Sequence, residues 1–159
     1  TEALLASPMG FTRFGEEGGW VRWGVADEAG GGPAPSGTRL DLAQRPESPR
    51  GMWGTGAIHH LAFRVDDEAH ELALRAAIGE SGPHPTPVIA RFWFKSVYFK
   101  EPGGVLFELA TDGPGFAVDE AKDRLGETLV LPPWLEPQRA AIAAGLPALV
   151  QPTAREAGS

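Results

Sequence analysis

The sequence predicts an α+β fold of paired βαβββ modules that form a curved mixed sheet, with the first module lacking its opening strand. Short runs of β-branched and aromatic residues are separated by glycine- and proline-rich turns, as in strands. One helical pattern lies between two of these runs. Residues 37–44 also align with residues 104–111, with glycine, leucine, alanine and an acidic residue at matching places. Such a repeat indicates two copies of one supersecondary unit whose apolar faces are buried together.

The first module is expected to cover residues 1–50. Proline and glycine at 8–10 end a short helix, because proline disfavours helix in the residue before it and glycine accepts a positive φ. The Glu-Glu-Gly-Gly sequence at 16–19 is typical of a hairpin turn. The expected elements are a helix at 2–7, strands at 11–14 and 20–25, a loop at 27–36 and a strand at 37–44.

The second module, residues 51–116, is expected to be complete, and a C-terminal extension with a short helix at 137–144 follows over residues 117–159. Asp66 and Asp67 are both suitable caps for the helix after the first strand. In that helix Glu71 and Arg75 are expected to pair on the outer face. The stripe expected to pack inward consists of Ala69, Leu72, Ala73 and Ala76. The expected elements are a strand at 58–65, a helix at 67–79 and strands at 88–94, 96–100 and 105–111.

Composition limits the classes of partner. The net charge of −7 argues against a nucleic-acid or anionic-membrane surface. The absence of cysteine excludes disulfides and thiolate ligands. There is no apolar run long enough to span a bilayer and no secretory leader, so we expect a cytoplasmic protein. Because the chain starts at Thr1 with a helix, it is expected to be a piece of a longer protein or a processed chain.

Two histidines and one glutamate stand in the predicted strands of the second module. His59 and His60 lie in the opening strand and Glu108 lies in an otherwise apolar closing strand. Because side chains alternate along a strand, His60 and Glu108 are expected to face one concave surface, while His59 faces the apolar side unless a bulge turns it inward. Such a pair can bind a metal and leave coordination positions open. The alternative is that each is a solvated residue at the sheet's rim.

Four stretches of the sequence carry a resemblance to a known family. They are 59–65 (HHLAFRV), 91–104 (RFWFKSVYFKEPGG), 107–116 (FELATDGPGF) and 129–136 (LVLPPWLE). With the internal repeat, they resemble the vicinal oxygen chelate superfamily, which has the glyoxalase/bleomycin-resistance/extradiol dioxygenase fold. More narrowly, they are similar to the ring-cleaving dioxygenases that act on hydroquinones. The similarity extends over most of residues 1–150.

The resemblance implies a set of site residues. In that family two histidines and a glutamate hold iron, and transfer by position gives His60 and Glu108 as ligands of Fe(II), with Mn(II) as the alternative metal. His59, Arg91 and Tyr98 match residues that contact substrate or oxygen. The other ligand histidine has no counterpart in this sequence. A missing N-terminal module or a second chain is therefore implied.

The implied function is an extradiol-type ring-cleaving dioxygenase, of which this chain is the C-terminal part. Its partners would be a small aromatic substrate and dioxygen, and a homo-oligomer is one arrangement it could take. Two other functions stay open at this point. One is a non-catalytic module of the same fold that binds an aromatic ligand or a partner chain. The other is a glyoxalase-like isomerase, which needs four protein ligands where the sequence offers two.

Overall fold

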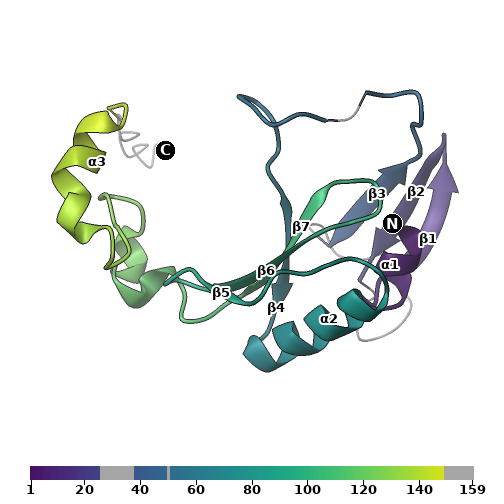
Figure 1. The fold of residues 1–159 in the computed structure, drawn as a ribbon, viewed down its shortest axis with the longest axis horizontal. Helices are drawn as coiled ribbons and strands as arrows, with labels where there is room; N and C mark the ends of the chain where they lie inside the picture. The colour runs from purple at the N-terminus through teal and green to yellow at the C-terminus, as the bar shows by residue number, and fades with distance from the viewer. Residues whose placement is uncertain (26–37, 50, 149–159) are drawn as a thin grey trace, which may run out of the picture.

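The computed structural model describes residues 1–25, 38–49 and 51–148, which form an α+β arrangement with two sheets. Figure 1 shows a crescent in which the N-terminal sheet forms one end, the second sheet the middle and the C-terminal helix the other end. The loop expected at 27–36 lies outside the described residues.

The first sheet is antiparallel and follows a short helix, α1 (Glu2–Ala6), close to where the sequence predicts it. Gly18 and Gly19 have φ angles of 57° and 79° and join β1 to β2 in a two-residue hairpin turn. Glycine adopts these positive angles without steric cost, which explains the Gly-Gly sequence. The strands are β1 (Thr12–Glu17), β2 (Trp20–Gly24) and β3 (Arg39–Ala43), in the spatial order β1-β2-β3.

The second sheet has the order β4-β7-β6-β5 and contains one parallel pair. β4 (Leu61–Val65) runs parallel to β7 (Leu106–Thr111) and leads into the helix α2 (Glu68–Glu80). The Asp67 side chain caps α2 by accepting a hydrogen bond from the backbone N–H of His70 at 2.8 Å. The other strands are β5 (Ile89–Ala90) and β6 (Lys95–Lys100), and each antiparallel pairing involves β6.

Two strands of the second sheet are at least three residues shorter than the sequence predicts. The strand expected at 58–65 begins only at Leu61, so His59 and His60 precede the ladder. The strand expected at 88–94 is reduced to β5, because Phe92 has a φ of 75° and a positive φ ends an extended run. As a result, the two histidines and Arg91 lie at the ends of strands, where alternation no longer dictates their direction.

The predicted fold class is confirmed, with one difference in how the sheets are joined. The order α1, β1, β2, β3 recurs as α2, β5, β6, β7, and within the described residues only the second unit has a strand before its helix. The sequence predicts one curved sheet, whereas β3 and β4 here are edge strands of separate sheets. The module boundaries at residues 50 and 116 remain predictions.

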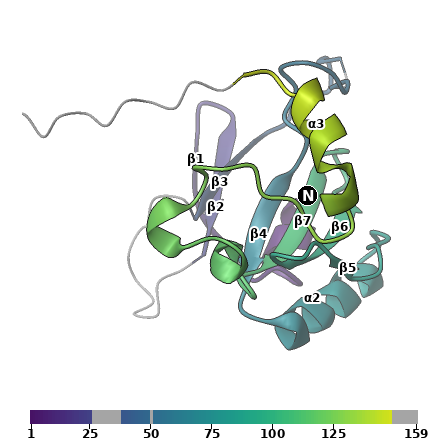
Figure 2. The same ribbon diagram turned by 90° about the vertical axis from the view of Figure 1, so that its left-hand side faces the viewer.

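One hydrophobic core joins α1, both sheets and α2. Its buried members are Leu4, Leu5, Trp23, Val65, Ile78, Val97, Phe99, Phe107 and Leu109. Figures 1 and 2 show α2 running along one face of the second sheet, and the opposite face is open. The helix therefore fixes which side of the sheet is left for a ligand.

The packed face of α2 differs from the predicted one. The expected inner stripe, Ala69, Leu72, Ala73 and Ala76, is exposed. Ile78 is buried instead, and Leu74 packs against the core. Burying these larger side chains removes more apolar surface from water than burying alanines. Glu71 consequently faces the sheet and is fully buried, so its expected pairing with Arg75 is wrong; Arg75 donates to the carbonyl of Thr86 at 2.6 Å.

A C-terminal arm follows β7. The Trp93 indole N–H donates to Asp119 at 3.0 Å, and the Gly115 N–H donates to the Trp93 carbonyl at 2.7 Å, which ties the arm to the loop after β5. Its elements are the 3-10 turns η1 (Phe116–Val118), η2 (Lys122–Arg124) and η3 (Glu136–Gln138) and the helix α3 (Arg139–Gly145), close to the helix expected at 137–144. In the described ranges, no helix combines the length and the apolar character needed to cross a membrane.

Candidate active site

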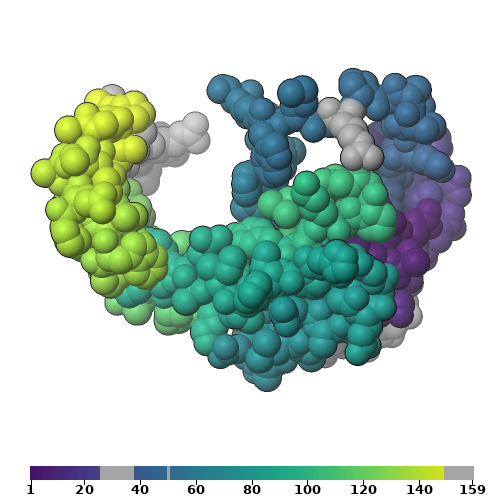
Figure 3. Space-filling view, in the orientation of Figure 1, coloured from purple at the N-terminus to yellow at the C-terminus, as the bar shows by residue number. Residues whose placement is uncertain are grey.

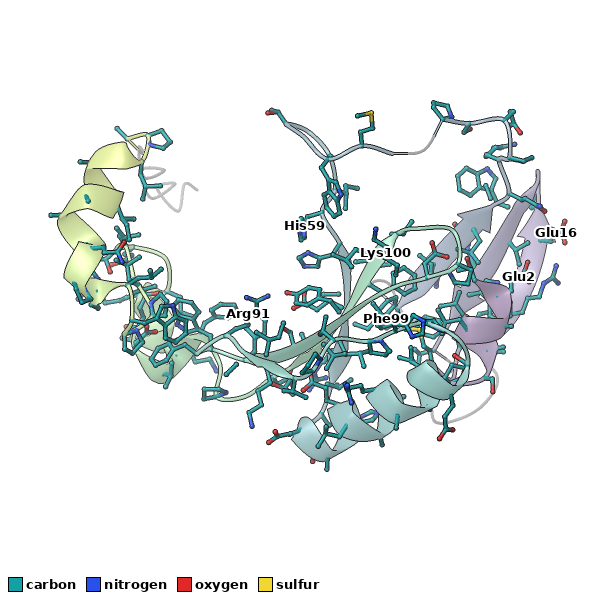
Figure 4. The ribbon with its side chains drawn as sticks, viewed as in Figure 1. Glu2, Glu16, His59, Arg91, Phe99 and Lys100 are labelled. Carbon is teal, nitrogen blue, oxygen red and sulfur yellow. The ribbon has the colours of Figure 1, made fainter. Side chains whose placement is uncertain are left out.

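The open face of the second sheet forms the floor of a broad hollow. Figure 3 shows this hollow between the C-terminal arm on one side and the segment before β4 on the other. In Figure 4, His59 lies on the wall formed by the segment before β4, and Arg91 lies on the floor toward the arm. All five predicted site residues lie here in one continuous series of contacts, in the order His59, His60, Glu108, Tyr98 and Arg91.

His60 and Glu108 meet, as the strand pairing predicts. In the parallel register of β4 and β7, Ala62 is the partner of Glu108. His60 stands two residues before Ala62, just ahead of the ladder, and its side chain lies on the same face. Its Nε2 lies 2.7 Å from Oε2 of Glu108, whose side chain is almost fully buried at 3% exposure. An imidazole nitrogen and a buried carboxylate oxygen thus converge on the concave face.

Tyr98 contacts the other oxygen of the same carboxylate. It is the antiparallel partner of Glu108 in the β6–β7 register, and its hydroxyl donates to Oε1 at 2.7 Å. The His60 and Tyr98 rings are nearly perpendicular, with their centroids 5.8 Å apart. Both carboxylate oxygens of Glu108 are therefore fixed, one by each neighbour, which limits rotation of the carboxylate.

Arg91 places a positive charge over the Tyr98 ring. Its guanidinium carbon lies 5.3 Å from the ring centroid, within the range of a cation–π interaction. Its Nε also donates weakly to Ser96 Oγ, at 3.4 Å. The positive φ of Phe92 turns the chain directly after Arg91, and the Arg91 N–H donates to the Phe94 carbonyl at 2.8 Å. The loop after β5 thus holds Arg91 at the edge of the site.

His59 lies beside His60, and not against the apolar core as strict alternation predicts. The two Nδ1 atoms are 2.8 Å apart. Because both residues precede β4, no ladder forces their side chains to opposite faces. His59 also contacts Trp53, whose ring centroid is 4.6 Å from that of His59. No motif in the sequence marks Trp53 as a neighbour of the site.

The donors fit a divalent metal in type but are too few to enclose it. Imidazole and carboxylate are the ligands that iron and related metals take in two-histidine, one-carboxylate sites. In residues 1–25, 38–49 and 51–148, no group of three or more histidine, aspartate or glutamate side chains could hold an ion. His60 and Glu108 supply two of the three donors that such a site requires.

Asp41 is the counterpart of Glu108 in the internal repeat, but its surroundings differ. It accepts two hydrogen bonds from the Arg22 guanidinium, at 2.8 and 2.7 Å, on an exposed part of the first sheet. These hydrogen bonds hold the pKa of the Asp41 carboxyl below its usual range. The first sheet therefore uses its acidic residue in a surface ion pair, and only the second sheet directs one into the hollow.

Comparison with known proteins shows which proteins this chain resembles. No protein-family model matches the chain. The chain is 42% identical over 145 residues to "Putative ring-cleaving dioxygenase MhqA" of Bacillus subtilis (strain 168), a match that covers 90% of this chain and 45% of that protein. It is 34% identical over 125 residues to "Chlorohydroquinone/hydroquinone 1,2-dioxygenase" of Sphingobium indicum, covering 77% of this chain and 37% of that protein. The chain thus spans less than half the length of these relatives.

Solved structures agree with the sequence relatives. The crystal structure of a "putative dioxygenase" from Bacillus subtilis superposes with a TM-score of 0.81 at 39% identity, over 94% of this chain and 46% of that one. A glyoxylase/bleomycin resistance protein/dioxygenase domain from Frankia sp. EAN1pec, with a TM-score of 0.53 at 13% identity, covers 72% of this chain and 83% of that one and shows the fold alone. The chain is therefore homologous to proteins named ring-cleaving dioxygenases, and it shares the fold of a glyoxylase/bleomycin resistance protein/dioxygenase domain.

Proposed function

We propose that this chain is part of a metal-dependent dioxygenase that opens hydroquinone-like aromatic rings with dioxygen. His60 and Glu108 would be two of the ligands of Fe(II), with Mn(II) as the alternative metal. The observation that carries the proposal is the 2.7 Å approach of His60 Nε2 to Glu108 Oε2 on the concave face. The names of the relatives support the reaction class and the hydroquinone substrates.

The metal and the side chains around it would have separate chemical roles. When bound, the ion would lower the pKa of a coordinated ring hydroxyl and bring the ring close to dioxygen. The Tyr98 hydroxyl donates its single proton to Glu108 in this structure, and that proton would become available to a substrate oxygen once Glu108 held the ion. Arg91, held at the edge of the site, supplies positive charge that stabilises negative charge developing on the ring oxygens. His59 would contact either the substrate or the ligand set.

Replacing Tyr98 by phenylalanine tests its part of this scheme. The substitution keeps the ring under Arg91 and removes only the hydroxyl that donates to Glu108. Removing one preorganised donor from an active site lowers kcat by about 10²–10³-fold. We expect that loss of turnover with hydroquinone, measured by oxygen uptake, while the metal content stays at the wild-type level. Loss of metal together with activity would instead make Tyr98 a residue that only orients Glu108.

We propose further that the missing ligand comes from a part of the protein outside residues 1–159. This proposal is supported by the coverage of the relatives, of which more than half lies beyond the match. A groove of about 1090 Å³ between the two sheets would receive a strand from that part. Such a strand would pair parallel to β3, as β4 pairs parallel to β7 in the second module. It would also convert the two separate sheets into one.

The lining of the groove supports a strand as its occupant. Consecutive side chains of a strand point to opposite faces, so a groove lined by consecutive residues follows the edge of the strand. The β3 residues that line the groove are Leu40, Asp41, Leu42 and Ala43. Leu61 at the start of β4 and Phe107 of β7 line it as well. Unpaired strand edges of this kind bind extended segments through backbone hydrogen bonds.

Single-cysteine labelling tests the groove, because the chain has no cysteine of its own. Gln44→Cys places a thiol in the groove, and Leu72→Cys places a control thiol on the exposed face of α2. We expect maleimide to label both quickly in residues 1–159 and to label only Leu72→Cys quickly in the longer protein. Equal labelling of Gln44→Cys in both proteins would contradict the strand, and protection by self-association of residues 1–159 would make a second copy the occupant.

An oxygen-uptake assay tests the proposed function as a whole. The longer protein, loaded with Fe(II), is expected to consume dioxygen with hydroquinone as substrate. A folded protein that binds hydroquinone without metal and without oxygen uptake would instead be the non-catalytic binding module. A cytoplasmic location and a homo-oligomer remain predictions from the sequence.

A further inference from the structure

We propose that the C-terminal arm positions Arg91: it holds the tip of the hairpin formed by β5 and β6 and so keeps the Arg91 guanidinium over Tyr98. The positioning residues in the arm are Asp119, Phe116 and Trp134. The consequence for turnover rests on the proposed function, because that function takes Arg91 as part of the active site. The inference gives a role to the arm, which lies outside the internal repeat.

The side-chain contacts of Arg91 are weak. Its hydrogen bond to Ser96 Oγ is long, at 3.4 Å, and its cation–π contact with the Tyr98 ring is formed by an exposed side chain. An exposed arginine has many rotamers, and ordering it costs conformational entropy. The position of the guanidinium therefore depends on where the backbone of the loop at 91–94 places the residue.

The hairpin alone holds this loop weakly. β5 has two residues, which pair with Ser96 and Lys95 of β6, and so short a strand at the edge of a sheet adds few hydrogen bonds. The loop also contains Phe92, whose φ is 75°. A bulky residue at a positive φ is strained, and such a conformation persists only where its surroundings hold it. The loop therefore needs support from outside the hairpin.

The arm contacts both residues at the tip of the loop. The Trp93 indole N–H donates to Asp119 Oδ1 at 3.0 Å. Phe116 stacks against Trp93, with an interplanar angle of 27° and the centroids 6.3 Å apart. Trp134 meets Phe92 edge to face, at 86° and 6.5 Å. These ring distances are within the range in which aromatic pairs attract each other, so the arm supplies the support that the strained loop needs.

The positioning residues lie outside the hydrophobic core. Phe116 and Trp134 expose 61% and 58% of their surface, and Asp119 is exposed as well. The core joins α1, α2 and the two sheets, whereas Arg91 lies on the floor of the hollow toward the arm (Figure 4). Substitutions of exposed side chains usually change stability little. The effect of the arm on Arg91 can therefore be measured in a folded chain.

Proton NMR of residues 1–159 reads the position of Arg91 without metal or substrate. Protons above an aromatic ring are shifted upfield by the ring current, so we expect upfield shifts for the Arg91 side-chain protons nearest Tyr98. Asp119→Ala and Trp134→Leu should each reduce these shifts, and the double variant should bring them close to those of a free arginine side chain. Wild-type shifts in the double variant, or no upfield shift in the wild-type chain, would overturn the inference.

Two further variants are matched controls for these substitutions. Asp119→Asn keeps a side-chain oxygen that can accept from the Trp93 indole, so it should keep the wild-type Arg91 shifts. Trp20→Leu removes an exposed tryptophan from β2, outside the arm, and should keep them as well. A displacement of Arg91 by Trp20→Leu as large as that by Trp134→Leu would overturn the assignment to the arm.

Oxygen uptake by the longer protein, loaded with Fe(II), tests the consequence for turnover. Displacing a positioned group by about 1 Å can lower a rate by about 100-fold, so we expect the Asp119→Ala/Trp134→Leu double variant to lose about 10–100-fold in kcat with unchanged metal content. If the arm acts through Arg91, the same double variant should change kcat by less than about twofold when Arg91 is already alanine. Losses that multiplied in the combined variant would overturn this route.

The two measurements separate the failure of this inference from the failure of the proposed function. A wild-type longer protein that took up no oxygen with hydroquinone would contradict the proposed function, while the NMR shifts would still decide whether the arm positions Arg91. Arg91 shifts that did not respond to the arm variants, in a protein that does take up oxygen, would overturn the role of the arm alone.

Discussion

Replacing Glu108 by glutamine is expected to reduce metal affinity by more than 100-fold and to abolish oxygen uptake. Glutamine has nearly the same shape, but its amide has lost the charge that the ion would neutralise and one of the two carboxylate oxygens. Loss of an outer hydrogen-bond partner of a metal ligand already costs about 10–100-fold in affinity, so loss of the ligand itself should exceed that range. Zinc titration calorimetry measures the affinity, and circular dichroism checks that the variant is folded.

The internal repeat provides a matched control for this substitution. Asp41 occupies the position in the first unit that Glu108 occupies in the second, but it is exposed and bound to Arg22. Asp41→Asn should therefore leave metal affinity unchanged and remove only a surface ion pair, which contributes little to stability because both charges are solvated. If Asp41→Asn and Glu108→Gln behaved alike, the assignment of the site to the second sheet would be wrong.

Replacing Glu71 by leucine is expected to stabilise the fold by about 1–3 kcal/mol at neutral pH. Both carboxyl oxygens of Glu71 are buried beneath the second sheet without a hydrogen-bond partner among the described residues. Burial raises the pKa of Glu71, and the nearby negative charges of Glu68 and Glu108 raise it further, while Lys95 lowers it. Leucine fills a similar volume and carries no polar group that must lose its water. Urea denaturation measures the difference in unfolding free energy.

The same residue makes stability depend on pH in a defined direction. When pH rises past the ordinary glutamate pKa of 4.5, the unfolded chain loses this proton while the folded chain keeps it. The unfolding free energy contributed by Glu71 therefore falls from that pH upward and levels off above the raised folded-state pKa. Glu71→Leu should lose this decline, so the two proteins should be closest in stability near pH 4. A gap between them that did not change with pH would contradict the account.

Strand pairing is the part of the site that the sequence predicts well. Once 58–65 and 105–111 are taken as neighbouring strands, alternation alone brings His60 to the face of Glu108, and the structure has them 2.7 Å apart. Tyr98 and Arg91 are implied only by the family resemblance, and the register of β6 with β7 explains why Tyr98 reaches the same carboxylate. Alternation along each strand and the pairing of β4 with β7 are therefore sufficient to predict that His60 and Glu108 share a face.

The features that the sequence does not predict depend on where regular structure ends. His59 follows alternation only if β4 includes it, and β4 starts two residues later. The packed face of α2 could not be read from its alanines, because they contribute little apolar area and the larger Leu74 and Ile78 decide which face is buried. The separation of the sheets at β3 and β4 depends on a strand position that no residue in the described ranges fills.

The most direct test of the account is a crystal structure of the longer protein soaked with Mn²⁺, with data collected to locate the ion by anomalous scattering. The account predicts one strong peak at bonding distance from both His60 Nε2 and Glu108 Oε2, with Tyr98 still beside the carboxylate. A peak elsewhere in the protein, with the His60 and Glu108 side chains still in direct contact with each other, would contradict it.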